Sequence, residues 1–169
     1  MNTEVYDTTH CGPTQMSIDL NSLAQKAAVV VSRQVGRSVV LATPQLLKDK
    51  TRSLIVRCTV QDAGWTAGAT TDRPAAVIIK YMRDNPQLGF SEWASLAYLA
   101  TLPAAHTLVP RFLGGDVDER FFVMTDLGDG QSLEAILQRK DKEVALATLR
   151  DLAICMARLH AATLITEET

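Results

Sequence analysis

The chain has 169 residues, enough for one domain or one domain with an arm, and a formal net charge of −2 from 17 basic and 19 acidic side chains. This balance offers no excess of lysine and arginine to neutralise a phosphate backbone, so we expect no nucleic-acid partner. The three cysteines, Cys11, Cys58 and Cys155, form no pair of metal-ligand spacing, and no stretch approaches the roughly 18 apolar residues of a membrane helix, so we expect reduced thiols, no membrane contact and a cytoplasmic location.

The N-terminal segment predicts an arm followed by a helix. Residues 1–16 are polar, contain Gly12 and Pro13, and predict a flexible arm. Between Asn21 and Gly36 the apolar residues recur at helical spacing, with Asn21 able to cap the start and Gly36 placed where a left-handed residue ends a helix. We expect this helix to pack on the sheet that follows.

Three strands are predicted next. The β-type runs Ser38–Thr43 and Ser53–Val60 flank a basic connection at residues 48–52, which indicates a hairpin. After a long turn of small and polar residues, Ala75–Lys80 predicts a third strand. Its apolar run, residues 77–79, suits burial on both faces of the sheet.

The second half of the chain is mostly helical by pattern. A helix is predicted over Ser91–Leu102, where Pro103 ends it, and the segment "ERFFVMTDL" supplies at least one further strand. A short helix over Ser132–Gln138 and a long amphipathic helix over Asp141–Ala162 follow. The apolar stripe of the long helix needs a surface to cover. It consists of Ala145, Leu149, Leu152, Ala153, Met156 and Leu159.

A lysine at the end of the third strand needs explanation. Lys80 closes an apolar run, and burying an ammonium group costs desolvation free energy unless an anion meets it. Glu92, at the start of the expected helix and on the flank of its apolar stripe, is a candidate partner; the remaining Lys80 donors would then suit a polyphosphate. The alternative stays open, because Lys80 can snorkel to solvent while the helix dipole favours a first-turn glutamate.

In this order the segments resemble the N-terminal lobe of the aminoglycoside phosphotransferase and choline kinase family, relatives of protein kinases that phosphorylate small molecules. The resemblance covers roughly residues 38–165 and rests on "AVIIKYM", "FSEWASLAYLATLP", "VPRFLGGDVDERFFVMTDLGDGQSLEAIL" and "LRDLAICMARLHAATL". It implies an α+β fold, with a kinase-like N-lobe over 17–124 that contains a mainly antiparallel sheet and an αC-type helix. A hinge at 125–130 and an incomplete C-lobe at 131–169 would follow.

The resemblance also implies an ATP site. Lys80 would bind the α- and β-phosphates, Glu92 would orient Lys80, and the backbone of Thr125, Asp126 and Leu127 would face adenine. Met124 stands at the gatekeeper position, where plain core packing is the alternative. Asp126 belongs to an apparent D-L-G, but it closes a strand and follows no catalytic loop, which favours a hinge role over metal binding.

Further candidates lie in the first hairpin. Lys48, Lys50, Arg52 and Ser53 are able to touch phosphates, although a solvated hairpin tip is the alternative for each. The surrounding "LLKDKTRS" contains no glycine and departs from the glycine-rich loop of protein kinases.

No histidine matches a catalytic loop: the residues after His10, His106 and His160 are Cys-Gly, Thr-Leu and Ala-Ala. We therefore expect the ATP-binding portion of a small-molecule kinase, with no catalytic residue in this chain and inactive by itself. Its Mg²⁺ ligands and the site for an aminoglycoside, choline-like or sugar-like acceptor are expected in a missing C-terminal part. The alternative is a non-catalytic nucleotide-binding or protein-interaction module that self-associates through residues 141–162, whose apolar stripe has little else to cover.

Overall fold

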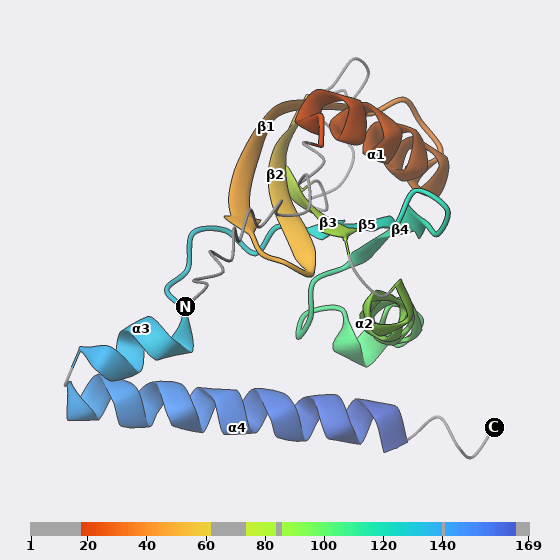
Figure 1. The fold of residues 1–169 in the computed structure, drawn as a ribbon. Helices are drawn as coiled ribbons and strands as arrows, with labels where there is room; N and C mark the ends of the chain where they lie inside the picture. The colour runs from red at the N-terminus through yellow and green to blue at the C-terminus, as the bar shows by residue number, and fades with distance from the viewer. Residues whose placement is uncertain (1–17, 62–73, 84–85, 140, 165–169) are drawn as a thin grey trace, which may run out of the picture.

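The chain folds as an α+β protein in which one antiparallel sheet carries helices on both faces (Figure 1). This computed structural model describes residues 18–61, 74–83, 86–139 and 141–164. Within these ranges the elements are α1 (Leu20–Val35), β1 (Val40–Asp49), β2 (Ser53–Gln61), β3 (Ala76–Met82), α2 (Pro86–Leu99), the 3-10 turn η1 (Pro103–Ala105), β4 (Phe112–Asp116), β5 (Phe121–Thr125), α3 (Leu133–Gln138) and α4 (Lys142–Leu164). The five strands lie in the order β1-β2-β3-β5-β4, and every neighbouring pair is antiparallel. The expected arm at 1–16 and most of the long turn lie outside the described residues.

The first helix forms where the sequence predicts it, but Asp19 caps it instead of Asn21. The Asp19 backbone is extended and its carboxylate accepts a hydrogen bond from the Asn21 amide at 2.9 Å, which places Asn21 inside the first turn. At the other end Gly36 adopts the expected left-handed conformation, with φ of 70°. The helix buries Leu23, Ala24, Ala27 and Val31 against the sheet, as expected.

Strand β1 is longer than the sequence predicts. The expected strand ends at Thr43, whereas β1 continues to Asp49 through two register shifts against β2. Thr43 has a positive φ of 51° and begins the first irregularity, which accommodates Pro44 within the strand. The connection to β2 is correspondingly short, because Lys50 and Ser53 exchange backbone hydrogen bonds of 3.0 and 3.2 Å.

The core lies between α1 and the sheet face opposite α2. Alternate residues of the central strands point into it, since successive side chains of a strand face opposite sides. The predicted burial of residues 77–79 on β3 is confirmed. The buried set on the α1 side includes Leu54, Val56, Cys58, Val77, Ile79, Leu113, Phe121 and Val123.

Helix α2 begins earlier than the sequence predicts. It starts at Pro86, a residue favoured in the first turn, so Glu92 lies in the middle of the helix and not in its first turn. The helix ends at Leu99, ahead of the expected Leu102. Trp93 anchors it to the sheet: its ring centroid lies 5.7 Å from that of Phe112 and 6.3 Å from that of Phe122. Gly115 permits this contact, because a Cβ there would meet the Trp93 ring at 2.6 Å.

Helices α3 and α4 extend from the sheet and leave much apolar surface uncovered. Ser132 caps α3, and the Asp141 carboxylate accepts hydrogen bonds from two backbone amides at the start of α4, both 3.1 Å long. Helix α4 contacts mainly α3 and η1, and Figure 1 shows it running apart from the sheet. Its exposed large side chains are Val144, Leu146, Leu149, Leu152, Ile154, Met156 and Leu164.

Candidate functional site

The face of the sheet opposite α1 carries cationic side chains from neighbouring strands, among them Arg57 on β2 and Lys80 on β3. Register pairs Ile55 with Lys80 and Arg57 with Ile78, so Arg57 and Lys80 lie on the same face. Phe122 pairs with Lys80 from the other side and shares that face with Met124. We call this surface, formed by Arg57, Ile78, Lys80, Phe122 and Met124, the cation face.

Lys80 and Glu92 form the ion pair that the sequence suggests. The Lys80 ammonium donates to the Glu92 carboxylate, although 12 residues and a change of element separate them. The Lys80 side chain is 19% exposed and that of Glu92 is 46% exposed, so the pair adds at most about 1 kcal/mol to stability. Trp93, next to Glu92, packs on Phe122 and thereby seats the helix that carries the carboxylate. The pair therefore orients the ammonium more than it stabilises the fold.

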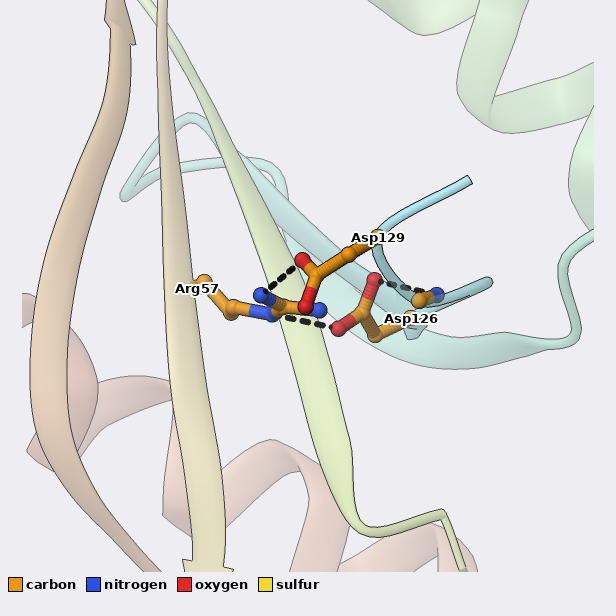
Figure 2. Close-up of polar contacts among 4 residues, drawn as sticks. Arg57, Asp126 and Asp129 are labelled. Carbon is orange, nitrogen blue, oxygen red and sulfur yellow. Dashed lines mark hydrogen bonds and ion pairs between the residues drawn. The ribbon is translucent and has the colours of Figure 1, made fainter. Parts of the chain in front are cut away.

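Arg57 forms a second charged group that sequence reasoning missed. Its Nε donates to Asp126 at 2.5 Å and its Nη1 donates to Asp129 at 2.6 Å, as Figure 2 shows. Asp126 also accepts a hydrogen bond from the Gly128 amide at 3.0 Å. The hydrogen bonds to Asp129 and then to Asp126 raise the pKa of Arg57, because both carboxylates favour its charged form. We call the Arg57 guanidinium with its two carboxylate partners the Arg57 fork.

The predicted hinge residues differ in what their backbones offer. The Thr125 and Asp126 amides donate to the carbonyls of Arg111 and Ala76, at 2.9 and 3.2 Å. Within the described part of the chain, the Leu127 amide has no such acceptor, and the residue is 75% exposed. Of the three predicted residues, Leu127 therefore offers a free backbone donor.

The remaining candidates lie along the same surface or at its end. Met124 is half-buried on the cation face, in register with Ile78 and Phe112, so it borders the site as well as the core. Arg52 lies in the hairpin turn and Ser53 begins β2 opposite Met82, both beyond Lys80 on the side away from Arg57. Arg52 is exposed and its carbonyl accepts a hydrogen bond from the Arg83 amide at 3.0 Å. The hairpin turn, Lys80 and the Arg57 fork therefore follow one another along the face.

Two surface hollows lie away from these residues. One, of about 450 Å³, borders α1 and includes Ser32 and Arg33, and another, of about 280 Å³, lies between η1 and α4 beside Arg158. Neither is lined by a residue of the cation face. The candidate site is thus defined by its charged side chains and not by these hollows.

Comparison with known proteins assigns no family, since no protein-family model and no curated protein matches the chain. Among the described residues, no group of three or more His, Cys, Asp or Glu is gathered where it could hold a metal ion. The helices in those same ranges also lack the length and apolar character needed to cross a bilayer.

Proposed function

We propose that the chain is the ATP-binding portion of a small-molecule kinase and that the cation face receives the nucleotide. The observation that carries this proposal is the Lys80–Glu92 ion pair between β3 and α2. A lysine on the third strand paired with a glutamate of the next helix is the arrangement with which protein kinases hold ATP phosphates. After α2 come strands β4 and β5 and then residues 126–130, in line with the sheet and the hinge that the family resemblance implies.

The layout of the cation face supports one orientation of the ligand. Lys80 contacts the α- and β-phosphates while Glu92 holds the ammonium in place, with Arg52 and Ser53 at the phosphate end. Adenine lies at the opposite end, where the Leu127 amide donates to the edge of the base. Met124 lines the face between these two ends.

Phosphoryl transfer itself is assigned to no described residue. ATP is used by kinases with Mg²⁺, which bridges and neutralises the phosphates, but the described residues gather no ligand set for that ion. By this proposal the chain binds nucleotide without transferring phosphate. The acceptor class, a hydroxyl of an aminoglycoside, choline-like or sugar-like compound, follows from the family resemblance alone.

Calorimetric titration with Mg-ATP tests the proposal. We expect Lys80→Ala to weaken binding about tenfold or more, because a hydrogen bond to a charged group contributes about 1.5–3 kcal/mol. Lys26→Ala is the matched control, since it also removes one positive charge and a long-range ion pair, with Glu119, but lies on α1. Equal affinities of the wild type and Lys80→Ala, or no binding by the wild type, would contradict the proposal.

A second candidate function, an interaction module that self-associates through α4, is favoured by the exposure of that helix's apolar side chains. Sedimentation velocity tests it. We expect a concentration-dependent dimer that is lost when Leu149 and Leu152 are both replaced by Glu, because charges would then interrupt the apolar stripe. Val29→Glu, at an exposed apolar position of α1, is the control. A wild type that sediments as a monomer at every concentration rejects this candidate.

A further inference from the structure

The segment that follows β5, residues 127–130, makes few contacts that would fix its backbone conformation. Leu127, Gly128, Asp129 and Gly130 are all exposed, and Gly128 has a positive φ of 87°. A Cβ at Gly128 or Gly130 would meet no atom within 4 Å, so the chain passes through open space there. Two glycines in such a segment permit many backbone conformations. An external restraint is needed to select one.

Arg57 supplies that restraint from a strand two positions away in the sheet. Its register neighbour is Ile78 on β3, whose own neighbour on β5 is Met124, so the guanidinium reaches across β3 to Asp126 and Asp129. One planar group thereby joins two carboxylates three residues apart, which would otherwise repel one another.

The restraint is transmitted to the backbone. The Asp126 side chain is only 10% exposed, and its second oxygen accepts a hydrogen bond from the Gly128 amide. Arg57 therefore holds Asp126 directly and the Gly128 amide through Asp126, and these two groups flank Leu127. Asp129 is 87% exposed and is held on the face by Arg57. Figure 2 shows the three charged side chains converging from β2 and from the segment after β5.

We propose that Arg57 is a positioning residue for the base end of the nucleotide site, holding the Leu127 amide at a fixed place relative to Lys80. This inference rests on the proposed function. A segment ordered in advance loses less conformational entropy when a ligand binds. Removal of the fork should therefore weaken the binding of ligands that use the base end, and it should leave the binding of ligands that contact Lys80 alone unchanged.

Two ligands separate these effects: Mg-ATP, which spans the face, and Mg-tripolyphosphate, which has no base. We expect Arg57→Met to weaken Mg-ATP binding about tenfold and to change tripolyphosphate binding less than about twofold. Lys80→Ala should weaken both ligands. Arg57→Lys should restore part of the ATP affinity, because an ammonium can contact one carboxylate but cannot form the fork.

Further variants control for folding and charge. Asp129→Asn, at an exposed position, removes one of the two carboxylates of the fork. It should weaken Mg-ATP binding without weakening tripolyphosphate binding, but by a smaller factor than Arg57→Met. Lys26→Met matches the charge change of Arg57→Met on α1 and should alter neither ligand. In the unliganded protein the Gly128 amide, which donates to Asp126, should exchange with solvent faster in Arg57→Met and at the wild-type rate in Lys26→Met.

The outcomes distinguish this inference from the proposed function. If the wild type binds neither ligand, the proposed function and this inference are both rejected. If ATP binds and Lys80→Ala weakens that binding, the proposed function stands. In that case the inference is overturned when Arg57→Met weakens the binding of both ligands equally or of neither. Unchanged exchange of the Gly128 amide in Arg57→Met also overturns it.

Discussion

Cys58 illustrates how burial sets the chemistry of a single side chain. It lies on β2 within the core, with none of its surface exposed. Burial raises the pKa of the Cys58 thiol to about 11, since a thiolate would be poorly solvated there. Cys155 on α4 is partly exposed, and Cys11 lies outside the described residues. Of the two described thiols, Cys58 should therefore be the less reactive.

We expect this burial to make stability fall at alkaline pH. Between pH 9.0 and about 11 the unfolded thiol loses its proton while the folded thiol keeps it. The unfolded state then binds fewer protons, so the free energy of unfolding decreases as pH rises. Urea denaturation of the wild type and Cys58→Ala across this range measures the effect as a difference in slope. Identical slopes would show that burial does not perturb the thiol.

The two charged groups of the cation face were not equally visible in the sequence. Lys80 ends an apolar run, so the neighbouring residues alone indicate that its ammonium group needs an anionic partner, and Glu92 follows within the next helix. Arg57 occupies an alternate position of β2, where an exposed charged residue is ordinary, and its partners lie 69 and 72 residues away. The one local sign of the fork was the pair of aspartates around Gly128.

At the level of elements, residue pattern predicted helix and strand types better than their ends. The helix types follow from periodicity, whereas the cap of α1 depends on which side-chain oxygen reaches a free backbone amide, and this selects Asp19 over Asn21. The sequence predicts a strand end at Thr43, whereas pairing with β2 continues β1 to Asp49, since the irregularities in its register accommodate Pro44.

The cap of α1 gives a direct test at this scale. We expect Asp19→Ala to lower the free energy of unfolding by about 1 kcal/mol, because the Asn21 amide loses its acceptor. Asn21→Ala is the comparison: an exposed first-turn position where alanine is the better helix former, so stability should not fall. Chemical denaturation of both variants decides between the caps. A larger loss for Asn21→Ala would favour the sequence-based assignment.

For the molecule as a whole, the sheet and α4 should differ in local stability. Strand β3 is central and buried, whereas α4 contacts mainly α3 and η1. We expect the amides of residues 145–160 to exchange with solvent at least tenfold faster than those of residues 77–80, as measured by hydrogen-exchange mass spectrometry of a dilute sample. Protection of α4 equal to that of β3 in dilute solution would show that its apolar side is covered.

The irregular β1 strand affects whether copies of the protein can associate through the edges of their sheets. Among the strands that the structure describes, β1 and β4 are the outer ones, and unpaired backbone groups at such edges can recruit a strand from another molecule. Pro44 removes a donor from β1, two register shifts distort that strand, and β4 has only five residues with an irregularity of its own. Both edges are therefore poor templates for sheet extension. Fibrillar growth by strand addition is disfavoured on either side of the sheet.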